Sequence, residues 1–309
     1  MTKINKPISQ HYLPKTYLKG FVIDKKDSRR KSLIYCYWTN QYETKIKETG
    51  IGSEKFKIEN FYTIESKTEP FVIENHILSQ FVELLYVTIM DEVEKELNLT
   101  LECRENLIIW IYNNKFRNPA YRKELERVIA YFIEYIYALE NNIEMSDELK
   151  HASKKKVEIK ARKKHLDMLT DVDKFMKFRD GMGIKHWSIL KSKLDNQFLT
   201  NDNPGFSINV ELENSNLTAD FSSLNYLYAL DSTASNFFIL SPIYCLFIKP
   251  FPLGTPLDIS LHNQKIEFET LEDIHIDFVN HCTKETRTTY LISNDENLLK
   301  KHTKKNDVS

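Results

Sequence analysis

The stretch QHYLPKTYLKGF, residues 10–21, places a histidine directly before a run of apolar anchors. Pro14 suits the first turn of a helix, where its missing N–H group costs no hydrogen bond. Gly20 suits the position after the last turn, where a left-handed backbone is favourable. The anchors that can dock on one surface are Tyr17, Leu18 and Phe21. We therefore predict a short helix pinned to a core, with His11 just ahead of its N-terminus.

Strand-like and helical patterns are segregated along the rest of the chain. SLIYCYW, residues 32–38, is rich in β-branched and aromatic residues and predicts a strand. Helical periodicity dominates from about residue 71 to 180, and strand-like segments return after it. This order predicts an α+β fold. We expect a mixed sheet built from N-terminal and C-terminal strands, with the helical block 71–180 as an insertion-like subdomain.

Length and composition limit the domain organisation and the class of protein. We predict a single α+β domain over residues 1–300 and a flexible tail over 301–309. The formal net charge of −1 gives no overall excess that would mark a nucleic-acid binder, so a binding patch must come from local clustering. No segment has the pattern of a signal peptide or a membrane span, which predicts a cytoplasmic protein without membrane contact.

The cysteines Cys36, Cys103, Cys245 and Cys282 lie far apart and form no CxxC pair. Their neighbours are apolar, as in IYCYW and IYCLFI. This pattern favours small buried thiols in a reducing compartment over a zinc ribbon.

A basic helix is predicted over residues 146–171, with Ser146 as its N-cap. Few of its positions are apolar, so only a narrow face of the helix can pack against a core. The residues that could contact a nucleic-acid backbone are Lys154, Lys155, Lys156, Lys160, Arg162, Lys163 and Lys164. Two other interpretations stay open: residues 150–164 could bind a protein partner, or the helix could simply be solvated.

Several motifs spread over residues 10–293 resemble the bacterial family called domain of unknown function 4238. The opening signature corresponds to His11, Tyr12, Pro14, Tyr17, Leu18 and Phe21. The later motifs are Arg117-Asn118-Pro119, Thr200 to Pro204 after Trp187, Leu240-Ser241-Pro242, and Asn280. Asn201 stands where the family usually has Ser. Gly20 stands where it often has Asn, and we expect that exchange to be neutral because both residues tolerate a left-handed cap. The family name implies no activity.

The polar residues of these motifs suggest a composite site. His11 can transfer protons near neutral pH, and Arg117 can clamp a phosphate with two parallel hydrogen bonds. Asp202 can orient the histidine or bind a divalent metal, although no metal-ligand spacing identifies one. The predicted ligand-binding residues are Gln10, Asn203 and Asn280. A purely structural interpretation stays open, in which Asp202 caps its turn, Arg117 ends a helix and His11 binds a carbonyl group.

We expect a nucleic-acid-directed phosphodiesterase with a role in bacterial defence or a toxin-like role. The alternative is a non-catalytic ligand-sensing or protein-interaction module of a defence system. A rival motif, Arg179 to His186, is similar to the Arg-x(4–6)-His motif of the HEPN ribonucleases, in which both residues lie on one helix. Gly181 and Gly183 make a helix across that motif less favourable.

Overall fold

Short elements at the N-terminus are followed by a helical block and then by strands, as the sequence predicted. The structure is a computed structural model that describes residues 9–39, 44–64, 69–213, 216–225, 234–251 and 260–303. The N-terminal elements are β1 (Ser9–His11), α1 (Lys15–Leu18), η1 (Lys19–Phe21), β2 (Leu33–Thr39), β3 (Thr44–Gly50), η2 (Glu54–Phe56) and β4 (Lys57–Glu59). The short helix after His11 is confirmed by α1 and η1.

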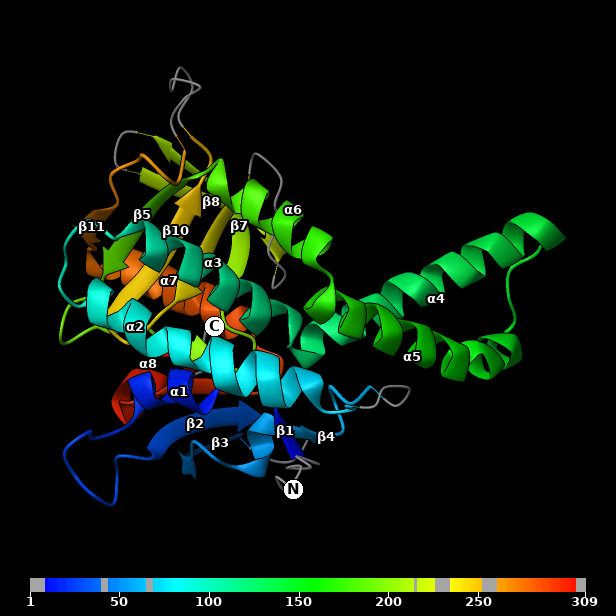
Figure 1. The fold of residues 1–309 in the computed structure, drawn as a ribbon, viewed down its shortest axis with the longest axis horizontal. Coiled ribbons are helices and arrows are strands. Elements are labelled where there is room, and N and C mark those ends of the chain that lie inside the picture. Colours follow the sequence, from blue (N-terminus) through cyan, green and yellow to red (C-terminus); the bar gives the residue numbers. More distant parts are fainter. Residues whose placement is uncertain are drawn as a thin grey trace, which may run out of the picture.

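The helical block begins with an unusual element. Residues Ile73–Val82 form a π-helix, η3, which continues directly into the α-helix α2. The helices that follow η3 are α2 (Glu83–Val93), α3 (Leu101–Phe116), α4 (Pro119–Asn141), α5 (Asp147–Thr170) and α6 (Val172–Gly183). Ser146 caps α5 as predicted, because its Oγ accepts a hydrogen bond from the Leu149 N–H at 3.4 Å. Helices α4 and α5 form a hairpin that projects from the body as an arm (Figure 1).

The C-terminal part supplies most of the strands. Its elements are β5 (His186–Lys191), β6 (Thr200–Asn201), β7 (Phe206–Glu213), β8 (Asn216–Asn225), β9 (Ser235–Ile239), β10 (Tyr244–Lys249), β11 (Glu267–Thr270), α7 (Asp273–Glu285), β12 (Leu291–Ser293) and α8 (Glu296–Thr303). One sheet has the order β11-β5-β10-β9-β7-β8, with β11 parallel to β5. A second has the order β3-β2-β12-β6, and β1 pairs with β4. The α+β class is thus confirmed, and N-terminal and C-terminal strands do share a sheet.

One expectation for the C-terminus differs from the structure. The polar segment after residue 293 forms α8 to Thr303, so residues 301–303 of the predicted tail are helical, and 304–309 lie outside the described residues. Leu298 and Leu299 are buried, and this apolar contact is what holds α8 in place.

Tyr17 lies at the centre of the core and is fully buried. Its hydroxyl donates a hydrogen bond to the Ile239 carbonyl at 2.8 Å and accepts one from Thr200 Oγ1 at 2.5 Å. Ile239 ends β9 and Thr200 begins β6, so one side chain joins the two larger sheets. Its ring also packs against the rings of Phe21, Tyr86, Trp110 and Phe238.

The reason for a glycine at position 20 differs from the predicted one. Gly20 lies inside η1 and does not have a positive φ. A Cβ atom built there would lie 2.5 Å from the Tyr86 hydroxyl, which itself donates to the Leu240 carbonyl at 2.8 Å. The left-handed cap is therefore the wrong reason to expect Asn to be neutral here, because any side chain at this position must displace the Tyr86 hydroxyl.

All four cysteines are buried and none is in a disulfide. Within the described ranges, no helix is both long enough and apolar enough to cross a lipid bilayer.

We predict that Gly20→Ala lowers the free energy of unfolding by about 1–3 kcal/mol, because the new methyl group overlaps the Tyr86 hydroxyl. Urea titration of the purified variant measures the change. Gly183→Ala is the matched control, since a Cβ there meets no atom within 4 Å. We expect that control to be neutral or slightly stabilising. Tyr86→Phe should relieve part of the Gly20→Ala effect, and equal effects of Gly20→Ala in the presence and absence of that hydroxyl would contradict the steric explanation.

Candidate functional site

His11 and Arg117, two of the three predicted catalytic residues, are neighbours. Arg117 follows the last residue of α3, and its Nη2 donates hydrogen bonds to the backbone carbonyl of His11 and, at 3.3 Å, to Glu83 Oε1. The guanidinium is fully buried. Among the described residues, its Nε and Nη1 have no hydrogen-bond partner. Arg117 therefore has two donor nitrogens without partners in a buried position, which is an unfavourable arrangement unless an anion or another acceptor meets them.

Two carboxyl groups from the π-helix region complete the cluster, and sequence reasoning missed both. Glu83 pairs with Arg117 at 3.3 Å. Glu74, in the first turn of η3, interacts electrostatically with both Arg117 and Glu83. Burial raises the pKa of the Glu74 carboxyl to about 7, and the Arg117 charge opposes that rise. Its buried Oε2 has no partner in the described part of the chain.

The imidazole of His11 is half-buried and lies among positive charges. Burial is the largest of the effects that lower its pKa to about 4, followed by the charges of Lys15, Lys57 and Arg117, while the Glu54 carboxylate opposes them. The ring is therefore neutral at physiological pH, and no described residue is hydrogen-bonded to its Nε2. The surrounding positive potential favours an anionic group beside the ring.

Gln10 is hydrogen-bonded to the loop that contains Tyr62 and Thr63. Its Oε1 accepts a hydrogen bond from the Tyr62 backbone N–H at 2.5 Å, and its Nε2 donates to Thr63 Oγ1 at 3.5 Å. Tyr62 in turn donates its hydroxyl proton to the Arg117 carbonyl at 2.6 Å. Gln10 is fully buried, and its hydrogen bonds hold residues 62–63 near the end of α3 instead of reaching solvent.

The backbone of Asp202, the third predicted catalytic residue, contacts Asn118, which follows Arg117 in the sequence. Its carboxylate binds a different part of the chain. Asn118 Nδ2 donates to the Asp202 backbone carbonyl at 2.7 Å. The carboxylate accepts hydrogen bonds from the backbone N–H groups of Thr288 and Thr289, both at 2.9 Å. Burial raises its pKa to about 6, and these N–H groups oppose the rise. Within the described residues its hydrogen bonds fix the start of β12 and do not reach His11.

The remaining predicted ligand-binding residues also bind their own chain. Asn203 Oδ1 accepts from Lys115 Nζ at 3.2 Å, and the same ammonium group binds the Pro204 and Gly205 carbonyls. Burial lowers the pKa of Lys115 to about 7. Asn280 accepts from the Leu199 N–H at 2.7 Å and donates to the Gln197 carbonyl at 2.9 Å. Both asparagines are buried, so their amides shape the loops around β6.

Asn201, the departure from the family's Ser, has a clear structural use. Its Oδ1 accepts from the Asn203 N–H at 2.8 Å, and its Nδ2 donates to the Thr283 carbonyl at 2.6 Å. The amide thus closes the turn before Pro204 and ties it to α7 at the same time.

The basic residues of α5 divide into separate groups. Arg162 Nη2 donates to the Thr63 carbonyl at 3.0 Å, which places it beside the loop that Gln10 holds. Lys160, Lys163 and Lys164 line a cavity between α4 and α5 of about 460 Å³ with apolar residues of α4. The remaining basic residues, Lys154, Lys155 and Lys156, are exposed farther along the arm.

The residues of the rival ribonuclease motif do not share a helix. Arg179 lies on α6 and forms two hydrogen bonds with Glu105, at 2.8 and 2.7 Å. His186 begins β5. The geometry that the motif requires is therefore absent from this part of the described chain.

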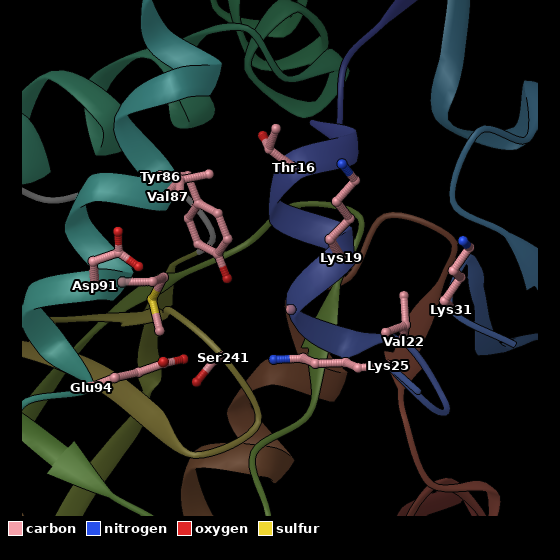
Figure 2. Close-up of a pocket in the computed structure, with 12 residues that line it drawn as sticks. Thr16, Lys19, Val22, Lys25, Lys31, Tyr86, Val87, Asp91, Glu94 and Ser241 are labelled. Atoms are coloured by element: carbon pink, nitrogen blue, oxygen red, sulfur yellow. The ribbon is translucent and has the colours of Figure 1, made fainter. Parts of the chain in front are cut away.

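A second candidate place for a ligand is a cavity of about 350 Å³ between α1–η1 and α2 (Figure 2). Lys19, Lys25 and Lys31 line it from the N-terminal segment, and Asp91 and Glu94 from α2. Figure 2 shows Lys25 extending toward Glu94 and Ser241. An adjoining cavity of about 290 Å³ shares Lys25, Glu94 and Ser241 with it. The walls thus carry opposite charges, which suits a dipolar ligand.

The predicted divalent metal was also considered as an occupant of this site. No group of three or more His, Cys, Asp or Glu side chains among the described residues could hold a metal ion.

The model of a family described as Protein of unknown function (DUF4238) matches residues 9–297. The chain belongs to this family. The match covers β1, η3 and the end of α3, and so the whole His11–Glu74–Glu83–Arg117 cluster of this DUF4238 protein. No curated protein and no solved structure matched the chain.

We predict that Glu74→Gln makes the protein more stable than wild type at about pH 8, by about 1–3 kcal/mol. The pKa of this carboxyl is about 7 in the folded state against an ordinary value of 4.5, so folding takes up a proton between these two pH values. The contribution of this proton uptake to the free energy of unfolding is therefore complete below about pH 4.5 and is lost as the pH rises through 7.

Urea unfolding at several pH values measures this difference, which should vanish near pH 4.5. Glu158→Gln, at an exposed carboxylate of α5, is the control and should show no such trend. Parallel pH profiles for wild type and Glu74→Gln would show that Glu74 is an ordinary surface acid.

Proposed function

We propose that this protein is a nucleic-acid-directed phosphodiesterase whose working groups are His11, Arg117 and Glu74. One observation carries the proposal. The buried Arg117 guanidinium has Nε and Nη1 without partners among the described residues, and its charge acts on both the His11 imidazole and the Glu74 carboxyl, whose pKa burial raises to about 7. An anion clamp beside two proton-transfer groups is what cleavage of a phosphodiester requires.

Each group has one role in this proposal. His11 takes a proton from the attacking water or ribose hydroxyl as the new P–O bond forms. Arg117 stabilises the negative charge that grows on the non-bridging phosphate oxygens. The protonated Glu74 gives its proton to the leaving oxygen as the old P–O bond breaks. Proton removal and proton delivery balance, so a second turnover needs only proton exchange between His11, Glu74 and solvent.

Positive charge supports a nucleic-acid substrate. Lys15 and Lys57 lower the pKa of His11 electrostatically and so lie within range of a phosphate bound beside the ring. Arg162 brings α5 to the loop at residues 60–63, next to the cluster. The exposed lysines 154–156 lie farther out on the arm, where they would contact the substrate backbone.

We place this activity in the cytoplasm of a bacterial cell, in defence or a toxin-like role. The four buried thiols without disulfides support a reducing compartment. Contacts to the phosphate backbone without base contacts give a broad substrate range, which fits action against foreign nucleic acid.

The second candidate function, a ligand-sensing module, is favoured by the cavity in Figure 2. The lysines on one wall of this cavity and the carboxylates on the other can bind a dipolar ligand without any catalytic step. It adjoins Gly20 and Tyr86, so an occupant would act on the contact between η1 and α2.

We expect His11→Ala to lower the rate of nucleic-acid cleavage by about 10²–10⁴-fold, because a positioned acid or base contributes that much. Labelled single-stranded and double-stranded DNA and RNA are the substrates, each assayed with a divalent metal and with EDTA. Glu74→Gln and Arg117→Lys should also lose activity. His76→Ala removes an exposed imidazole from η3 and should retain it. Asp202→Asn should change stability more than the rate per folded molecule, because its carboxylate binds the 288–289 backbone.

Equal rates for wild type and His11→Ala, with both proteins folded by circular dichroism, would rule out the catalytic assignment. Wild-type protein that cleaves none of the substrates while a dipolar ligand shifts its melting temperature would favour the sensing function.

A further inference from the structure

The arm formed by α4 and α5 exposes large apolar side chains that the body does not cover. Tyr131 and Leu139 are each 62% exposed, Phe132 is 55% exposed and Ile136 is 51% exposed. Ile143, in the connection between the helices, is 61% exposed. A contiguous apolar surface of this kind on an otherwise charged helix indicates a contact with another molecule.

The root half of the arm is an apolar groove with a positive rim. Ile129, Phe132, Ile133 and Ile136 of α4 line the cavity of about 460 Å³. From α5, three lysines (Lys160, Lys163 and Lys164) and one carboxylate (Asp167) line it, so its α5 side is net positive. No ion pair with a described residue engages these three lysines. The groove therefore fits a segment that is both apolar and acidic.

The tip of the same arm has that composition. Residues 140–148 contain Glu140, Glu144, Asp147 and Glu148 and no lysine or arginine. Leu139, Ile143 and Leu149 give this segment exposed apolar side chains. The tip cannot reach its own groove, because about ten helical residues, or roughly 15 Å of rigid helix, separate Ile133 from the turn.

We propose that two copies of this chain associate through their arms, antiparallel, so that the acidic tip of each lies on the lysine-rimmed groove of the other. A two-fold axis near Tyr135 and Ile136 produces both contacts at once and closes the assembly as a dimer. The four helices then bury the exposed stripe of both copies in one interface. The parallel arrangement is unfavourable, since it places Lys160, Lys163 and Lys164 against their own counterparts.

Other occupants fit the arm less well. A nucleic acid would neutralise the lysines but would leave Phe132, Ile136 and Leu139 exposed to water. A surface of anionic lipid would repel the four carboxylates of the tip. The dimer satisfies both the charges and the apolar side chains, and it does not depend on the chemistry proposed for His11.

Sedimentation equilibrium of the full chain tests the proposal. We expect a dimer at micromolar concentrations, and Ile136→Asp should raise its dissociation constant by at least about tenfold, because the side chain lies at the centre of the interface. Leu194→Asp is the matched control, since Leu194 is an 87%-exposed apolar residue of the body, outside the arm. It should leave the dimer unchanged. Circular dichroism checks that both variants fold.

A charge exchange tests the antiparallel register. One variant carries Lys160→Glu and Lys163→Glu, and the other carries Glu140→Lys and Glu144→Lys. Each alone places like charges at both contacts and should be mainly monomeric. An equimolar mixture restores opposite charges at both contacts and should form the heterodimer. A monomeric wild type, a dimer that Ile136→Asp leaves intact, or a mixture that stays monomeric would each overturn the proposal.

Discussion

The hydroxyl of Tyr17 is the interaction on which the rest of the structure depends. It donates to β9 of the six-stranded sheet and accepts from β6 of the four-stranded sheet, inside a shell of aromatic rings. Burial raises the pKa of this phenol well above its ordinary value, so the group stays neutral and keeps the proton that it donates. Because the Ile239 carbonyl and the Thr200 hydroxyl are both buried, loss of this contact would leave polar groups unsatisfied in both sheets.

The position of the candidate site follows from that constraint. Tyr17 fixes α1, and α1 fixes β1 immediately before it, so the His11 carbonyl meets the Arg117 guanidinium at the end of α3. The cluster then contains an arginine with two unused donors and a carboxyl whose ionisation burial opposes. Such groups reduce the stability of the fold, and they cluster at functional sites. The π-helix that carries Glu74 adds to this, since π-helical segments frequently mark such sites.

The arm has a different relation to the body. Its root is tied down by polar contacts, with Arg122 donating to His165 Nδ1 at 3.0 Å and to the Phe61 carbonyl at 2.7 Å. His165 is fully buried, and burial lowers its pKa to about 3, so the ring stays neutral and holds this junction over the physiological range. Beyond the root, the helices contact mainly each other (Figure 1). A rigid root and an uncovered apolar stripe are what an interaction element requires, whichever chemistry the body performs.

The sequence by itself determined the features that depend on neighbouring residues. Helical periodicity and the Ser146 cap located helices of the central block, and the order of helices and strands gave the α+β class. The signature around His11 indicated the family. These features are local, because a helix or a cap is set within a few residues. The tertiary structure alone decided which distant side chains meet. It gave Gly20 a steric role against Tyr86, turned the Asp202 carboxylate to the backbone just before β12, and brought Glu74 to Arg117. No pattern along the chain encodes such pairs, because they arise from how elements far apart in sequence pack and from which polar groups that packing buries.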